Sequence, residues 1–274
     1  PSWANSLFED NAEYGLGMYL GVKQSRERVA EMAKEVLAAE IPADLKEALQ
    51  AWLDNMNVSA GTRERAAALA EVLEKYKDQC DKCAALYAEK QYFVKRSHWI
   101  FGGGGWAYDI GYGGLDHVLA SGENVNVMVF DTEVYSNTGG QSSKSTPTAA
   151  IAKFAASGKK TKKKDLGMMA MSYGYVYVAQ IALGANPAQA LKAIQEAEAY
   201  NGPSLIIGYA PCELHGVKGG MNHCQDEMKA AVKAGYWNLF SYNPALKAEG
   251  KNPFTLTSKE GDGSYQAFLA NETR

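Results

Sequence analysis

The sequence predicts an α/β fold: a mainly parallel sheet flanked by helices, with a helical arm inserted near the N-terminus. In the second half of the 274-residue chain, short apolar runs alternate with helical segments, which is the pattern of a parallel sheet. Polar or glycine-rich segments directly follow two of these runs. Residues 25–90 instead carry apolar side chains at helical spacing, which predicts helices without strands.

The composition is that of a globular chain able to bury a core, with 46% apolar and 22% charged residues. The net charge of −3 favours neither nucleic acid nor an anionic membrane as a partner. Each apolar run is shorter than the roughly 18 residues of a membrane span, and the N-terminus lacks the pattern of a secretion signal. We therefore expect a soluble, unexported protein. The four cysteines favour reduced thiols in the cytoplasm or in another reducing, anaerobic compartment.

One domain with three parts is expected. Residues 25–95 form the helical arm, 96–215 the α/β core, and 216–274 a segment that wraps the surface. Residues 1–24 mix aromatics, glycines and acids and predict a helix packed into something larger. Three amphipathic helices are expected in the arm, on the apolar residues Val29, Met32, Val36 and Leu37, then Leu45, Leu49, Trp52 and Leu53, then Ala67, Leu69, Val72 and Leu73.

The core is expected to contain four strands. Glycines stop the first strand and a helix follows, while Asp131 begins a polar loop directly after the second. The third strand leads into a helix over 187–200 and the fourth into Pro211. We attribute the alternating Tyr173, Tyr175 and Tyr177 to packing within the third strand. The expected strands cover 97–101, 125–130, 173–181 and 204–210.

Two segments at the ends of these strands are candidate sites. Gly102–Gly105 would let the backbone approach a phosphate at a helix N-terminus, and the structural alternative is a tight turn that needs positive φ. Asp131–Gly140 offers hydroxyl, carboxylate and amide oxygens that suit Mg²⁺, and the alternative is a polar connection. Because ligands bind at the carboxyl ends of such strands, the two segments together describe a diphosphate and Mg²⁺ site.

A family resemblance rests on five segments: Asn5–Asp10, Trp99–Val118, Asp131–Gln141, Tyr173–Val176 and Gly250–Phe254. Over almost its whole length the chain resembles the thiamine diphosphate domain of pyruvate:ferredoxin (flavodoxin) oxidoreductase. Members of this family are homodimers of much longer chains, so the resemblance implies that this sequence is an internal fragment.

The resemblance implies a role for each candidate segment. The glycine turn would hold the diphosphate, and Thr132 with the main-chain oxygen of Val134 would bind Mg²⁺. Asn137 would lie beside the substrate and be needed for activity. The residues that would line the cofactor are Gly103, Gly104, Gly105, Trp106, Thr132, Glu133, Val134, Tyr135, Ser136 and Asn137.

Gly104 departs from the family pattern, in which this position is an aspartate that binds Mg²⁺. Loss of a charged ligand should weaken metal and cofactor binding together, because the cation neutralises the diphosphate. One alternative is therefore a cofactor-free scaffold of which only the domain interface survives.

For the whole enzyme, the resemblance implies oxidative decarboxylation of pyruvate to acetyl-CoA, with electrons passed through [4Fe–4S] clusters to ferredoxin or flavodoxin. Cys212 would be the last ligand of the cluster nearest the cofactor, and its three partner cysteines would precede this chain. Further catalytic groups would come from the remaining domains, so the isolated chain is expected to be inactive. A related 2-oxoacid:ferredoxin oxidoreductase is the alternative that keeps the cofactor and changes the substrate.

Two other motifs receive structural interpretations. Cys80 and Cys83 are neighbours at i, i+3 and lack the second pair that zinc or cluster sites need, so we interpret them as ordinary surface or packing cysteines. The basic run Lys159–Lys164 is interpreted as a solvated loop, with docking of an acidic ferredoxin as the alternative.

Overall fold

The computed structural model describes residues 8–274. Asn5–Leu7, which begin the first family-like segment, lie outside the described residues. The chain divides into two compact units, of which one contains the residues up to Leu16 together with His98–Arg274 and the other contains Gly17–Ser97. None of the helices within residues 8–274 is long and apolar enough to cross a membrane.

The first unit is built on a six-stranded sheet with the strand order β1-β2-β4-β3-β5-β6. Strands β1, β2, β4 and β3 pair in parallel, as expected. Beyond β3, β5 pairs antiparallel with β3, and β6 pairs antiparallel with β5. The strand bounds are β1 Trp99–Gly103, β2 Asn126–Asp131, β3 Tyr177–Ile181, β4 Ser204–Tyr209, β5 Phe240–Tyr242 and β6 Phe254–Leu256.

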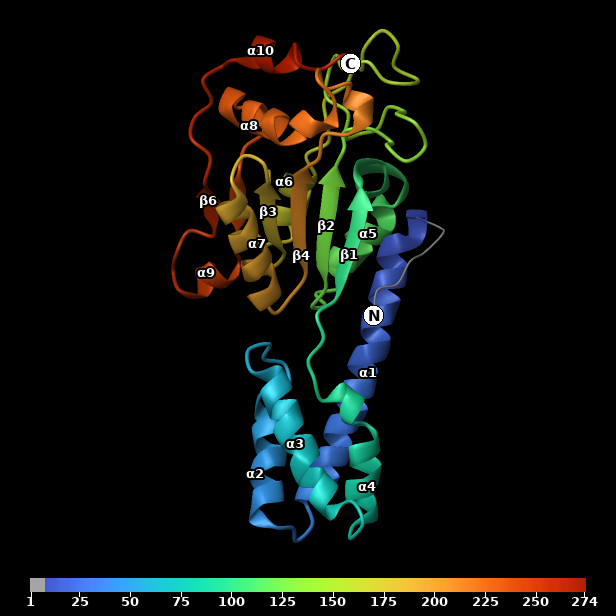
Figure 1. Ribbon diagram of the computed structural model, residues 1–274, viewed down its shortest axis with the longest axis vertical. Helices are drawn as coiled ribbons and strands as arrows, with labels where there is room; N and C mark the ends of the chain where they lie inside the picture. Colours follow the sequence, from blue (N-terminus) through green and yellow to red (C-terminus); the bar gives the residue numbers. More distant parts are fainter. Residues whose placement is uncertain (1–7) are drawn as a thin grey trace. The chain divides into compact units, whose positions relative to one another are not determined.

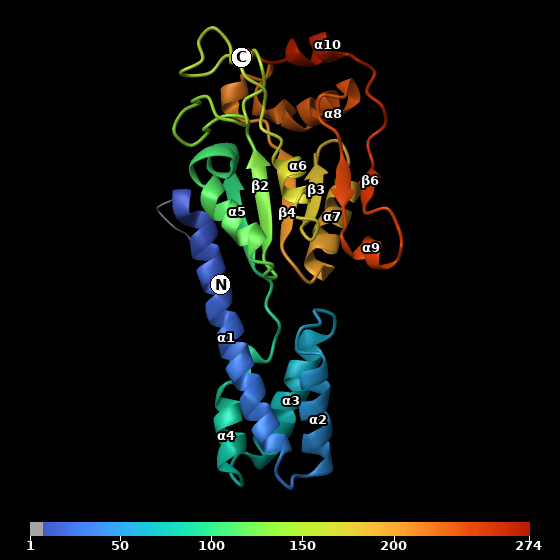
Figure 2. The same cartoon turned by 180° about the vertical axis from the view of Figure 1, so that it is seen from behind.

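Helices cover both faces of this sheet, as Figures 1 and 2 show from opposite sides. Helix α7 (Pro187–Ala199) packs its alanines against β3 and β4 in a cluster that includes Ile206. Helix α6 (Leu166–Met171) contacts the same two strands, and its Gly167 lies beside Ile207. Since neighbouring residues of a strand point to opposite faces, β4 is buried from both sides, and this explains its continuous apolar run.

The remaining helices of this unit lie after the glycine run and in the C-terminal third. The first is a five-residue π-helix, η3, that leads into α5. The C-terminal segment contains three α-helices, α8, α9 and α10. The five-residue helix α10 packs against α8. The bounds are η3 Trp106–Ile110, α5 Tyr112–Ala120, α8 Cys224–Ala234, α9 Ala245–Ala248 and α10 Tyr265–Leu269.

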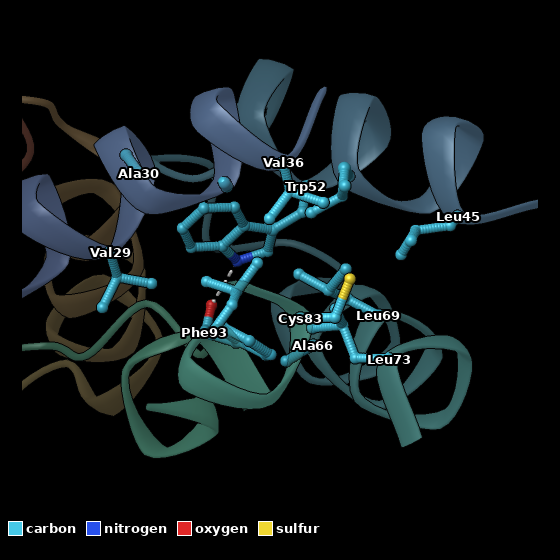
Figure 3. Close-up of a cluster of buried hydrophobic side chains, with 13 residues drawn as sticks. Val29, Ala30, Val36, Leu45, Trp52, Ala66, Leu69, Leu73, Cys83 and Phe93 are labelled. Carbon is cyan, nitrogen blue, oxygen red and sulfur yellow. Dashed lines mark hydrogen bonds between the residues drawn. The ribbon is translucent and has the colours of Figure 1, made fainter. Parts of the chain in front are cut away.

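The second unit is a helical bundle with its own core. Helix α1 runs without a break from Asn11 to Leu37, so its first residues belong to the sheet-containing unit. Trp52 is fully buried, and its indole nitrogen donates a hydrogen bond to the Phe93 carbonyl at 2.8 Å (Figure 3). The other helices of this unit are α2 Ala43–Asp54, α3 Thr62–Tyr76 and α4 Asp81–Ala88.

Several sequence predictions need correction. The expectation of three arm helices missed α4, because its eight residues carry too short an apolar pattern to detect. Tyr173 and Tyr175 precede β3, and their hydroxyls bond to the Asp116 carboxylate and the Ala120 carbonyl at 2.7 and 3.0 Å. The C-terminal segment also supplies β5 and β6, which are three residues each and so lack a recognisable alternation.

Candidate functional site

A pocket of about 490 Å³ lies where β1 and β2 end, entirely within the sheet-containing unit. Its residues come from the glycine run, from the loop after β2, and from the start of α1. Every sequence-predicted cofactor-lining residue except Glu133 borders it. The lining comprises Asn11, Phe101, Gly102, Gly103, Gly104, Gly105, Trp106, Thr132, Val134, Tyr135, Ser136, Asn137 and Thr138.

Gly102 and Gly105 are required for close packing, and none of the four glycines has positive φ. The alternative interpretation, a tight turn that needs positive φ, is therefore wrong. A Cβ on Gly102 would lie 2.1 Å from the Trp106 ring, and a Cβ on Gly105 would lie 2.4 Å from the Tyr135 ring. A Cβ on Gly103 would meet nothing within 4 Å, because that position faces the open pocket.

The glycine run changes conformation halfway. Gly102 and Gly103 end β1, whereas Gly104 and Gly105 form the first helical residues ahead of the π-helix. Backbone N–H groups at the start of a helix have no partners within the helix, and they bind phosphate groups readily. A π-turn is rare and occurs often at functional sites.

The loop after β2 brings two oxygen atoms together at the pocket. The Thr132 hydroxyl donates a hydrogen bond to the Val134 carbonyl oxygen at 3.0 Å, and both residues line the pocket. Glu133, between them, has φ of 59°, a left-handed conformation that is uncommon for a residue with a side chain. This conformation turns Glu133 away from the pocket while its two neighbours face it.

The Glu133 side chain is completely buried in a cluster of charged and polar groups. Its carboxylate accepts from the Lys163 ammonium at 3.1 Å, from the Tyr236 hydroxyl at 2.7 Å, and from the Arg274 guanidinium. Burial would raise the pKa of Glu133, but Lys163 and Arg274 outweigh it and lower the pKa to about 2. Glu133 is therefore an anionic anchor beneath the loop.

Asp131, the last residue of β2, belongs to the same buried cluster. Its carboxylate lies 2.7 Å from the Lys163 nitrogen and accepts from the Tyr108 hydroxyl at 2.7 Å. Burial raises the pKa of Asp131, with Lys163 opposing the shift, whereas the two carboxylates keep the pKa of Lys163 raised in spite of its burial. The cluster ties the end of β2 to the loop that follows it.

Lys163 comes from the basic run, which is only partly the solvated loop expected from the sequence. Lys160 and Lys162 are exposed, whereas Lys159, Lys163 and Lys164 are partly buried. Lys163 has 24% of its side chain exposed and pairs with two carboxylates. The Lys159 and Lys164 ammonium groups donate to the main-chain oxygens of Thr146 and Tyr108 at 2.6 and 3.2 Å. The sequence did not predict the contacts of Lys163, because its carboxylate partner Glu133 lies 30 residues away in the chain.

Gly104 faces the backbone of the loop after β2. A Cβ built on it would lie 3.4 Å from the backbone nitrogens of Thr132 and Glu133 and 2.9 Å from the Ser145 hydroxyl. A side chain at position 104 would therefore point toward the Thr132 segment. None of the described residues that line the pocket is acidic, so the site as it stands offers only neutral oxygens to a cation.

Asn11 was missed by the sequence analysis. Its amide donates to the Phe101 carbonyl at 2.7 Å and lines the pocket, although the two residues are 90 positions apart in sequence. No local pattern marks it. Asn137, by contrast, lies on the expected loop, where its side chain is exposed at the pocket.

Cys212 lies beyond the end of β4, where its backbone N–H donates to the Nδ1 atom of His215 at 2.8 Å. Within residues 8–274, no group of three or more His, Cys, Asp or Glu side chains is arranged to hold a metal ion. Cys212 is thus placed without fellow cluster ligands in the part of the chain that the structure describes.

Comparison with known proteins defines the class of this chain. Residues 83–207 match the family described as thiamine pyrophosphate enzyme, C-terminal TPP binding domain. This region contains β1, the glycine run and the loop after β2, which together form the pocket. Residues 83–207 are therefore similar to the thiamine pyrophosphate-binding domain of these enzymes.

Individual proteins similar to this chain indicate particular enzymes within this class. A pyruvate-flavodoxin oxidoreductase of Klebsiella pneumoniae is 60% identical over this whole chain, and a pyruvate:ferredoxin oxidoreductase of Moorella thermoacetica is 54% identical. A mitochondrial pyruvate dehydrogenase [NADP(+)] of Euglena gracilis is 48% identical. The chain spans 23%, 24% and 15% of these proteins, respectively. The predicted resemblance to pyruvate:ferredoxin (flavodoxin) oxidoreductases is thus confirmed, and the chain corresponds to one part of these longer proteins.

Proposed function

We propose that this chain binds thiamine diphosphate in the pocket at the ends of β1 and β2. The proposal rests on one observation. Thr132 and Val134, whose Oγ1 and carbonyl oxygen atoms are 3.0 Å apart, line the same pocket as the helical turn that begins at Gly104. The turn offers N–H donors to a diphosphate, and the two oxygens suit a hard cation. The family match over residues 83–207 supports this choice of cofactor.

The residues fit the diphosphate better than they fit its metal. The pocket volume of about 490 Å³ lies within the range of small-molecule sites. Gly103, which lines the pocket, has no side chain to occupy it. Mg²⁺ would be held by Thr132 and Val134 with no carboxylate from the described lining residues. We infer that the metal binds weakly and that cofactor affinity suffers with it.

The chain's own residues would bind and orient the cofactor. The Gly103–Trp106 segment would hold the diphosphate, and the neighbouring Thr132–Asn137 loop would also contact the cofactor. The exposed Asn137 amide would hydrogen-bond a polar atom of the substrate at the pocket. Thiamine diphosphate, when bound, supplies the carbanion-stabilising chemistry that breaks the bond next to the keto carbon.

For the full-length protein we propose oxidative decarboxylation of pyruvate to acetyl-CoA. The names of the relatives support pyruvate as substrate and flavodoxin or ferredoxin as acceptor, while the Euglena relative is named for NADP⁺. Cys212 would join three cysteines of another domain in a [4Fe–4S] cluster. The assembly would be a cytoplasmic homodimer, with 25–95 as its helical arm, 96–215 as cofactor core and 216–274 as wrapping segment. Alone, this chain would be inactive.

A second candidate, a cofactor-free scaffold, is favoured by one observation: no acidic residue borders the described pocket. The two candidates predict different titrations. Thiamine diphosphate with Mg²⁺ should be titrated calorimetrically into this chain, into Gly104→Asp and into Gly104→Ala. The alanine variant introduces the same Cβ contact with Ser145 without a carboxylate, so it separates steric from charge effects.

We expect Gly104→Asp to bind at least about tenfold more tightly than the unchanged chain, because a charged ligand restores the metal site. Gly104→Ala should bind no better than the unchanged chain. Binding by none of the three folded chains would contradict the cofactor proposal and favour the scaffold. Equal affinity of the aspartate and glycine chains would contradict the proposed weakness of the metal site.

A further inference from the structure

A pair of thiols in the helical unit has no part in the proposed cofactor site. Cys80 is the N-cap of α4, and its sulfur accepts a hydrogen bond from the backbone N–H of Cys83 at 3.2 Å. This contact gives the Cys80-Asp81-Lys82-Cys83 segment a defined geometry that spacing alone did not indicate.

The two thiols lie in different surroundings. Cys83 is 1% exposed and packs in the core of the unit with Leu69, Leu73 and Leu86 (Figure 3). Cys80 is partly exposed at the edge of that core. A reagent from solution can therefore reach Cys80 first, while Cys83 is sheltered behind it.

The position of Cys80 favours its thiolate. An N-cap acceptor receives backbone N–H groups at the positive end of the helix, and cysteines at helix N-termini or in Cys-X-X-Cys motifs are more acidic than free ones. Interaction with the Cys83 thiol lowers the pKa of Cys80, while burial raises the pKa of Cys83 to about 12. Cys80 is thus the nucleophile of the pair and Cys83 the protonated partner.

We propose that Cys80 and Cys83 form a thiol–disulfide exchange site that reacts with small disulfides. In the first step the Cys80 thiolate attacks one sulfur of glutathione disulfide, the S–S bond breaks, and one glutathione leaves as its thiolate. The Cys83 thiol then loses its proton and attacks the Cys80 sulfur, which releases the second glutathione. Each departing thiolate takes up one proton, so the pair is oxidised by two electrons and one disulfide is reduced to two thiols.

The test uses the full chain, treated with glutathione disulfide and analysed by peptide mass spectrometry. The unchanged chain should form the Cys80–Cys83 disulfide. Cys83→Ala should stop at a glutathione adduct on Cys80, because the backbone donor remains but the second thiol is gone. Cys80→Ser keeps an oxygen acceptor at the N-cap, and Cys83 should remain unmodified in this variant. It provides a second test of the proposal if Cys83→Ala misfolds.

Cys224 is a matched internal control, since it is partly exposed at the first residue of the longer helix α8 and has no cysteine three residues on. We expect iodoacetamide at pH 7 to alkylate Cys80 at least about fivefold faster than Cys224. Equal rates would overturn the proposal, as would a glutathione adduct on Cys80 that persists in the unchanged chain. Failure of this test would leave the cofactor proposal untouched, because the thiols lie outside the pocket.

Discussion

Glu133 and Lys163 form a buried ion pair, with 3.1 Å between the carboxylate and the ammonium group, directly behind the two residues that face the pocket. Thr132 and Val134 both line the pocket, and Glu133 between them occupies the left-handed conformation. That conformation is unfavourable for glutamate. The ion pair with Lys163 supplies the interaction that holds Glu133 in this conformation.

Replacing Glu133 by glutamine should destabilise the protein by about 3 kcal/mol, since Lys163 and Arg274 each lose one of their two carboxylate partners. Chemical denaturation would measure this. The exposed pair Glu249–Lys251, at 2.6 Å, provides the control, and Glu249→Gln should change stability little. Equal losses of stability in Glu133→Gln and Glu249→Gln would contradict the proposed stabilising role of the Glu133–Lys163 pair.

Stability should fall on acidification in a window set by His215. This imidazole is completely buried, and burial together with Arg274 lowers its pKa from 6.5 to about 3. The unfolded chain therefore binds a proton that the native chain refuses, and stability is lost as the pH falls from about 6.5 toward 3. Denaturation midpoints across this range should fall less steeply for His215→Asn than for the exposed-site control His223→Asn.

Glu133 should extend this acid sensitivity to lower pH. Its folded pKa of about 2 lies below the ordinary 4.5, so its contribution is complete above pH 4.5 and disappears as the pH approaches 2. Asp131 has a raised pKa and acts in the opposite direction. Acid unfolding of Glu133→Gln should therefore be flatter below pH 4.5 than that of the unchanged chain, and an identical slope would count against the anionic anchor.

Gly103 and Gly105, two residues apart in the glycine run, should respond differently to the same substitution. Gly105→Ala places a Cβ 2.4 Å from the Tyr135 ring and should cost about 1–3 kcal/mol through overpacking. Gly103→Ala meets no atom within 4 Å, so thermal unfolding should detect a smaller loss. Because its methyl group would enter the pocket, we expect weaker binding of thiamine diphosphate by calorimetry. Equal losses of stability would contradict the packing explanation.

The helical unit depends on one buried side chain at its centre. Trp52→Phe keeps an aromatic ring but removes the donor to the Phe93 carbonyl, and leaving that carbonyl unsatisfied should cost about 1–3 kcal/mol. Urea denaturation followed by circular dichroism would report it. The exposed Val58 offers a comparison, since Val58→Ala should have little effect.

Much of the fold could be predicted from local pattern. The apolar run Val125–Phe130 indicated β2 because a strand buried on both faces leaves a continuous apolar signature. The glycine run and the loop after β2 indicated the pocket because both follow parallel strands. Helix α4 and strands β5 and β6 escaped detection, since three to eight residues carry too little periodicity.

The sequence by itself determined the strand and helix periods, the position of the glycine run and the oxygen-rich loop, all of which are local features of the chain. Only the tertiary structure decided that Glu133 turns inward, since its partners Lys163 and Arg274 lie 30 and 141 residues away. Asn11 reaches the pocket for the same reason, across 90 residues of chain. Buried polar groups choose partners by position in space, and the packing of the sheet, rather than any local pattern, brings those partners together.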